Sequence, residues 1–265
     1  MSALAAIERA DMSARPAGTR FPGLVRAEIA KLTSTRAAGW LILSAGALSA
    51  LAVSGVVNAG ITLSGLGTQA GLRTVLAHGG VAAILPLVLG VLVSAGEYRH
   101  GTVVDTFLTE PRRSRVVGAK LLLGAGIGLV TGLLDIGVTA GTAAAWYSAK
   151  GVDLDLGSAV VLRSLVGIVV WTTLYGAIGV AVGSMIRTPP AAIVTVVVWL
   201  FIAETAVASL LVDVGKWLPA TAAAALGNRP LDGSLSQVGG GAVLLGWTVL
   251  AAAGAIVATT RRDVT

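Results

Sequence analysis

The residues of this chain that could do chemistry are few and stand far apart. Asp135 and Glu204 each lie alone within a long apolar run, and His78 and His100 are isolated from each other and from any carboxylate pair. Acid–base or metal chemistry needs clustered carboxylates, or a histidine beside a nucleophile. The pattern therefore predicts no catalytic residue and no metal site in this chain.

Asp135 and Glu204 still need an explanation, because an ionised carboxylate in hydrocarbon costs roughly 2.5 to 3.5 kcal/mol. Two interpretations remain open. The carboxylates line a path for cationic or polar cargo, or they are hydrogen-bonded to neighbours such as Thr131, Thr139 or Thr205, or lie near the outer head groups. Counting inward from the cytoplasmic ends of their helices, at a rise of about 1.5 Å per residue, places both carboxylates in the outer half of the membrane.

The densest charge lies in the segment 97–115, EYRHGTVVDTFLTEPRRSR. At 100° per residue, the apolar residues of 102–110 share one side of a helix: Val103, Val104, Phe107 and Leu108. Thr102 followed by Asp105 predicts an N-cap, after the permissive Gly101, and Pro111 predicts the end. We expect a short amphipathic helix that serves either as a simple loop holding topology or as a docking element for a soluble partner.

The composition of the chain predicts the environment in which these residues lie. The chain of 265 residues is 55% hydrophobic and 12% charged, with a mean hydropathy of +0.87 and no cysteine. Too few charges are present to coat a soluble globule, so the chain is predicted to be an all-α membrane protein. Runs near the roughly 20 residues needed per span predict six helices: 39–58, 74–96, 117–147, 161–186, 190–211 and 238–260.

Lys and Arg divide unequally between the two sides of this six-span arrangement. Fourteen of the 19 lie on the side of the termini and five on the other. The positive-inside rule therefore predicts that both termini and the 97–115 segment are cytoplasmic. The same rule accounts for the pI of about 10.3, so we expect no nucleic-acid partner.

The connections predict further elements. Residues 1–38 form a cytoplasmic segment with an interfacial helix over 21–36, residues 39–260 one transmembrane domain, and 261–265 a cytoplasmic tail. The outer segment 212–237 is too apolar for a solvated loop, and we expect short re-entrant helices broken by Pro219 and Pro230.

Glycines recur four residues apart within the spans, which lets helix backbones approach closely: Gly124/Gly128/Gly132, Gly137/Gly141 and Gly179/Gly183. The run GAGIG at 124–128 lies inside an apolar helix, so it is not read as a nucleotide loop. No G-x-x-x-x-G-K-[ST] motif occurs. Any ATP that drives this protein must therefore be bound by another chain.

Two stretches carry a family resemblance. E-Y-R-H-G-T at 97–102, with T-E-P-R-R-S-R at 109–115 and A-K-L at 119–121, resembles the cytoplasmic loop of ABC-2 type transporter permeases. L-x-x-x-E-I-A-K-L-T-S-T-R at 24–36 resembles the segment before their first span. The hydropathy of six spans covers the remainder of the chain.

The resemblance implies the permease subunit of an ATP-driven exporter, paired with a second permease copy and with two cytoplasmic ABC ATPase subunits that hold ATP and Mg²⁺. It implies a coupling helix between spans two and three, with no cofactor or enzymatic activity in this chain. The implied ATPase-coupling residues are Glu97, Arg99, Gly101, Thr102, Asp105, Phe107, Pro111, Arg112 and Arg113. The possible path residues are Glu204 and Asp135.

Two other classes remain as alternatives: a membrane-embedded enzyme, and an ATP-independent channel, carrier or scaffold. The separation of the intramembrane acids disfavours the enzyme. The 15 arginines against four lysines, among abundant Ala, Gly and Val, suggest a GC-rich bacterial genome and hence a bacterial cytoplasmic membrane.

Overall fold

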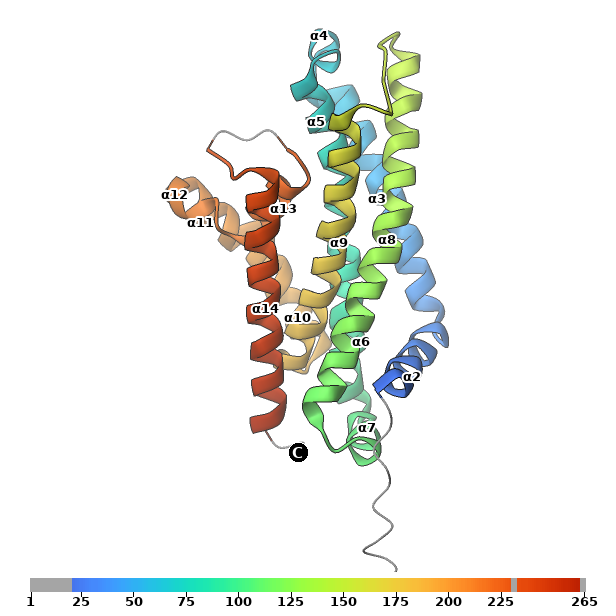
Figure 1. Cartoon of the computed structure of the whole chain (residues 1–265), viewed down its shortest axis with the longest axis vertical. Helices are drawn as coiled ribbons and strands as arrows, with labels where there is room; N and C mark the ends of the chain where they lie inside the picture. Colours follow the sequence, from blue (N-terminus) through green and yellow to red (C-terminus); the bar gives the residue numbers. More distant parts are fainter. Residues whose placement is uncertain (1–20, 230–232, 263–265) are drawn as a thin grey trace, which may run out of the picture.

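A computed structural model of the protein describes residues 21–229 and 233–262, which form helices joined by short connections (Figure 1). No strand occurs in these residues. Six helical segments are long and apolar enough to cross a membrane: Arg36–Gly60, Gln69–His100, Arg113–Ala149, Ala159–Ile186, Pro189–Leu210 and Gln237–Arg261. The expected all-α, multi-pass architecture with six spans is confirmed.

Two of the six spans are interrupted by non-α turns, and the first span ends in a π-helix. In chain order the spans consist of α3 (Arg36–Gly55) with the π-helix η1 (Val56–Gly60); α5 (Gln69–Ala77), the 3-10 helix η2 (His78–Ala83) and α6 (Ile84–His100); α8 (Arg113–Ala149); α9 (Ala159–Ile186); α10 (Pro189–Val198), the π-helix η3 (Trp199–Ala203) and α11 (Glu204–Leu210); and α14 (Gln237–Arg261). The shorter helices are α2 (Phe21–Thr33), α4 (Leu63–Leu66), α7 (Val103–Thr109), α12 (Val212–Gly215) and α13 (Pro219–Leu226).

Local sequence sets several helix ends. Ser158 and Ser236 cap α9 and α14 by accepting hydrogen bonds from the amides of Val161 and Gly239, as N-cap serines do. Arg187 ends α9 in the left-handed conformation with φ of 65°. Pro189 then starts α10 at a position where no amide proton is needed, which produces the tight turn between spans four and five.

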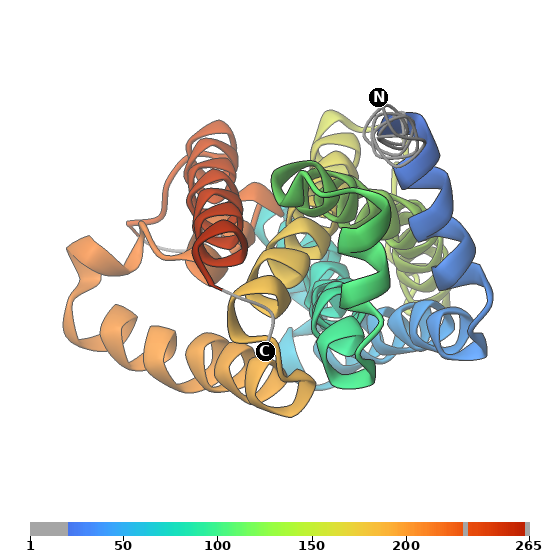
Figure 2. The ribbon, with the colours of Figure 1, turned by 90° about the horizontal axis from the view of Figure 1, so that it is seen from below.

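The two ends of the molecule differ. The basal end carries α2, α7 and the last turn of α14, and the distal end carries α4 and the connection between α8 and α9 (Figure 1). From the basal end, α2 and α3 lie on one side of the bundle and the α10–α12 arc lies on the other, with α6, α8 and α9 between them (Figure 2). The first and last described residues, Phe21 and Arg262, are therefore at the same end.

Glycine creates the closest helix contacts. A Cβ on Gly128 would overlap the carbonyl oxygen of Thr172, and Gly124 and Gly132 also face α9. On α9, Gly179 and Gly183 lie against the backbone of α6. The Gly137/Gly141 pair does not act in this way, because a Cβ on either residue would meet nothing within 4 Å. Successive helical residues turn by 100°, which places these two glycines roughly opposite Gly132.

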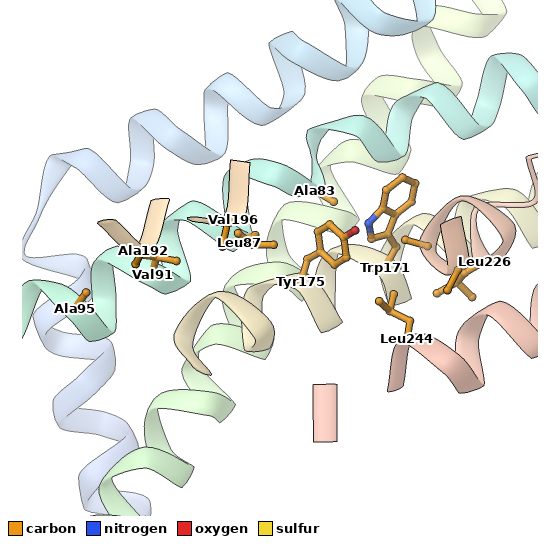
Figure 3. Close-up of a cluster of buried hydrophobic side chains, with 12 residues drawn as sticks. Ala83, Leu87, Val91, Ala95, Trp171, Tyr175, Ala192, Val196, Leu226 and Leu244 are labelled. Atoms are coloured by element: carbon orange, nitrogen blue, oxygen red, sulfur yellow. The ribbon is translucent and has the colours of Figure 1, made fainter. Parts of the chain in front are cut away.

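The largest buried cluster joins α6, α9, α10, α13 and α14 (Figure 3). The rings of Trp171 and Tyr175 meet edge to face at 5.8 Å between centroids. Leu87, Leu226 and Leu244 pack around this pair from three other helices. The outer flanks of the spans are apolar and exposed, as at Leu51, and suit contact with lipid rather than water.

The outer connection differs in part from expectation. Pro219 does not break a helix but occupies the first position of α13, whose buried residues include Ala222 and Leu226. Helix α13 packs against α14 and α9. Pro230 lies outside the described residues, as do residues 1–20 of the N-terminal segment and 263–265 of the tail.

Candidate functional site

The short helix α7 is present where the 97–115 segment predicts one, but its start is built differently. Gly101 adopts φ of 72° and ends α6 in the left-handed conformation, which glycine does without steric cost. Thr102 then has helical angles and its side chain makes no capping hydrogen bond. Thr102 thus occupies the expected N-cap position of α7, but the expected capping hydrogen bond is absent, because the chain enters α7 directly from the Gly101 turn.

The faces of α7 also differ from expectation. Val103 and Thr106 are buried, whereas Val104 and Leu108 are 47% and 72% exposed. The apolar residues predicted to share one buried side are thus divided. Phe107 is half-buried, with the Arg113 guanidinium 5.2 Å from its ring centroid. Helix α7 consequently presents an apolar surface, made of Val104 and Leu108, away from the bundle.

Thr106 faces inward because it contacts a network of four charged side chains at the basal end, three of which are buried. Lys31 donates to Glu28 at 2.8 Å, to Glu97 at 2.7 Å and to Thr106 Oγ1 at 3.2 Å. Lys120 lies 2.6 Å from Glu28 and 2.8 Å from Glu97. We call Glu28, Lys31, Glu97 and Lys120 the basal charge network. It connects α2, α6 and α8, and through Thr106 it holds α7.

The basal charge network is balanced, and three of its four members are buried, whereas the Lys31 side chain is 45% exposed. Glu28 and Lys120 are each 4% exposed and Glu97 is 8% exposed. Two carboxylates face two ammonium groups, so the cost of burial is offset by direct pairing. One oxygen, Glu97 Oε2, is buried without a hydrogen-bond partner among the described residues. This arrangement makes the network sensitive to loss of either lysine.

The pKa values of two members reflect this pairing. Burial opposes ionisation of Glu28, but Lys120 and then Lys31 outweigh it and hold the pKa of Glu28 below its ordinary value of 4.5. Burial also opposes the charge on Lys31, yet Glu28 and Glu97 raise the pKa of Lys31 above 10.5. The groups that outweigh burial all belong to the network, so Glu28 and Lys31 remain ionised through the neutral range.

We expect the contribution of Glu28 to stability to stay constant at neutral pH and to disappear in acid. A lowered pKa of Glu28 contributes stability above 4.5 that is lost as the pH falls through the folded-state pKa. The raised pKa of Lys31 contributes below 10.5 and is lost as the pH rises through its folded-state value. The melting temperatures of wild type and Glu28→Gln, compared from about pH 7 to about pH 3, should converge only below 4.5. Convergence at neutral pH would contradict this assignment.

The structure brings only some of the predicted coupling residues into contact with other helices. Glu97 is in the network, and Arg113 donates to the carbonyl oxygens of Thr259 at 3.1 Å and Arg262 at 2.9 Å. Arg113 thereby joins the start of α8 and the ring of Phe107 to the end of α14. The remaining predicted residues are exposed around α7: Arg99, Gly101, Thr102, Asp105, Pro111 and Arg112.

Sequence reasoning missed Glu28, Lys31 and Lys120 as members of the site. The sequence does contain a signal for two of these residues. Glu28 interrupts the apolar side of α2, and Lys120 lies within the apolar flank of span three. Each is an ionisable group at a position that otherwise favours hydrophobic residues. Glu110 was also missed, although it is 1% exposed and accepts from Arg115 at 3.1 Å.

Asp135 and Glu204 lie away from the basal charge network, in separate surroundings. Asp135 is fully buried and its Oδ1 is 3.1 Å from the hydroxyl of Ser49 on α3. Glu204 is 2% exposed, and its Oε1 accepts hydrogen bonds from the amides of Ala220 and Thr221. It thus takes the place of a capping side chain for α13, which begins after Leu218. The partners are not the threonines that the sequence suggested.

Metal ligation has no evident location in the part of the chain that is described. Between residues 21–229 and 233–262, no three His, Asp or Glu side chains gather as a metal site would require. The basal charge network offers two carboxylates, but both are already engaged by lysine ammonium groups. The basal charge network can act mechanically and electrostatically, because it holds α7 against three other helices.

Comparisons with known proteins leave the family undecided. No protein-family model matches the chain. A search of curated proteins also returns no significant match.

Proposed function

We propose that this chain is the permease subunit of an ABC-2 type exporter in a bacterial cytoplasmic membrane. In this proposal the basal end and both termini face the cytoplasm, and α7 is the coupling helix that docks on a soluble ATPase subunit. The chain itself binds no nucleotide. Two permease copies and two ATPase subunits form the complex, and movement of α7 changes the packing of the spans that surround the path.

One observation carries the proposal: α7 is fixed from inside and apolar outside. Lys31 ties Thr106 to Glu28 and Glu97 within the buried network. On the opposite side, Leu108 is 72% exposed. A short exposed apolar surface on a rigid support suits contact with a partner better than contact with water. A force on this surface would reach α2, α6 and α8 through charged contacts rather than through a flexible loop.

The charge of the basal end supports the orientation. Arginines and lysines gather there on α2, on α7 and its flanks, and at the ends of α9 and α14: Arg26, Lys31, Arg99, Arg112, Arg113, Arg115, Lys120, Arg187, Arg261 and Arg262. Short cytoplasmic segments of membrane proteins carry this excess. The predicted partner is therefore a cytoplasmic protein.

The ATPase partner is proposed from the resemblance of 24–36 and 97–121 to ABC-2 permeases, and the sequence has no phosphate-binding loop motif that would let this chain bind the ATP itself. ATP and Mg²⁺ would be held on that partner. Asp135 and Glu204 remain candidates for the path, although their observed hydrogen bonds are to other parts of this chain. Their role in transport is a prediction.

Leu108→Asp tests the docking role. The side chain is 72% exposed, so the variant should insert and fold, while a charge at the centre of an apolar contact should weaken docking by at least about tenfold, or 1.4 kcal/mol. The measurement is the ATPase activity of the permease reconstituted with the nucleotide-binding chain that copurifies with it. Leu63→Asp is the matched control, since Leu63 is 61% exposed on α4 at the distal end.

Equal ATPase stimulation by Leu108→Asp and wild type would rule out docking through α7. Failure of any nucleotide-binding chain to copurify would instead favour an ATP-independent channel, carrier or scaffold. Labelling of a cysteine introduced at Leu108 from outside the cell would reverse the orientation.

A further inference from the structure

A second buried polar site lies in the spans, between α3, η2 and α8, and the basal charge network does not involve it. Its members are Ser49, the carbonyl of Gly79, Asp135 and Thr139. Ser49, Asp135 and Thr139 are all completely buried. Asp135 is nearer the distal end of α8 than the basal end, so it lies within the membrane-spanning region.

When Asp135 is an ionised carboxylate, this site has one hydrogen-bond donor too few for its acceptors. The Ser49 hydroxyl lies 3.0 Å from the Gly79 carbonyl oxygen and 3.1 Å from Asp135 Oδ1. Both neighbours are then acceptors, but a serine has a single proton to donate. Asp135 Oδ2 has no partner among the described residues. An ionised Asp135 would therefore have at most one hydrogen bond from the described residues, and the Ser49 donor would be shared with the Gly79 carbonyl.

Within residues 21–229 and 233–262, no ion pair compensates the charge of Asp135. The titratable or charged residues of the elements packed around this part of α8 are Arg36 on α3, Arg73 on α5, His78 on η2, Glu97, Tyr98, Arg99 and His100 on α6, and Arg163, Tyr175 and Arg187 on α9. Among the described residues, no ion pair or hydrogen bond links Asp135 to the cationic side chains of α3 and α5, to His78 or to Arg163. A buried charge without a partner is neutralised by binding a proton or a cation.

The packing favours the proton over a metal cation. A Cβ on Gly79 would overlap the hydroxyl of Thr139, so the η2 backbone lies directly against α8. The site offers one carboxylate, two neutral hydroxyls and one carbonyl, with no other acid beside them. A proton on Asp135 Oδ1 completes the chain of donors: Asp135 donates to Ser49, and Ser49 donates to the Gly79 carbonyl.

We propose that Asp135, Ser49 and the Gly79 carbonyl form a proton-binding site that is occupied when α3, η2 and α8 are packed together. Separation of these helices would admit water and release the proton. The site thereby links proton binding to the packing of span one and the broken helix of span two against span three. This inference does not rest on the proposed ATPase partner, and its test requires neither transport nor nucleotide.

Infrared difference spectroscopy of the full-length protein in lipid nanodiscs at neutral pH is the direct test. Wild type should show the carbonyl stretch of a protonated carboxylic acid, and Asp135→Asn should lose that band. Ser49→Ala should keep the band at a shifted frequency, because the acid loses its hydrogen-bond acceptor. Glu204→Gln should leave the Asp135 band unchanged.

The two possible contradictions are distinct. An acid band that is identical in wild type, Asp135→Asn and Ser49→Ala would show that Asp135 carries no proton. A melting temperature of wild type that rises with NaCl but not with choline chloride, and does not respond in Asp135→Asn, would identify a sodium site instead. If Asp135→Asn does not fold, the frequency shift in Ser49→Ala alone decides the outcome.

Discussion

Lys120→Met is expected to lower the free energy of unfolding by about 3 to 5 kcal/mol, the cost of removing one partner from a buried ion pair. Lys120 is 4% exposed and contacts both Glu28 and Glu97. Methionine retains the length and apolar stem of lysine but leaves two buried carboxylates to share the single ammonium group of Lys31. The measurement is unfolding in detergent, followed by helix content.

Lys216→Met is the matched control, because it removes the same charge from another ion pair. Lys216 pairs with Asp213 at 3.3 Å, but the Asp213 side chain is 98% exposed. Exposed pairs contribute about 0 to 1 kcal/mol, so this variant should be close to wild type. Equal stability of the two variants would show that the basal charge network does not hold the helices together.

Gly128→Ala is expected to be among the most disruptive single-methyl changes in the spans. The new Cβ would overlap the backbone carbonyl of Thr172, which cannot rotate away as a side chain can. Helices α8 and α9 must therefore separate locally, at a cost of about 1 to 3 kcal/mol for overpacking. Thermal unfolding of the purified protein in detergent measures the loss.

Gly126→Ala provides the control on the same helix. A Cβ at Gly126 meets nothing within 4 Å, and alanine is favoured over glycine within helices by roughly 1 kcal/mol. We therefore expect Gly126→Ala to be neutral or stabilising. A loss of stability in both variants would point to a general intolerance of α8 rather than to the contact with α9.

Part of the candidate site could be predicted from residues close together in the sequence. Gly101 and Pro111 delimit a short helix between spans two and three because both act on the backbone within one or two residues. The inward direction of Thr106 could not be read in this way. It depends on Lys31, which is 75 residues distant in the chain and contributes a competing polar contact.

The spacing of glycines gave a similarly partial prediction. The periodicity of Gly124, Gly128 and Gly132 predicts one small-residue side of α8, and the structure places α9 against it. Gly137 and Gly141 have the same spacing but no helix against them. Spacing defines a side of a helix, whereas the arrangement of the other helices decides whether that side is covered.

The sequence by itself determined the solvent of this protein, the six spans and the approximate ends of its helices, because these follow from hydrophobic run length and from local backbone preferences. Only the tertiary structure decided which charges meet. Glu28 and Lys120 lie 92 residues apart, and Glu204 caps a helix that begins 15 residues later along the chain. Such pairings depend on how the helices pack in three dimensions, since a buried ionisable group is stable only beside a partner brought to it by the fold.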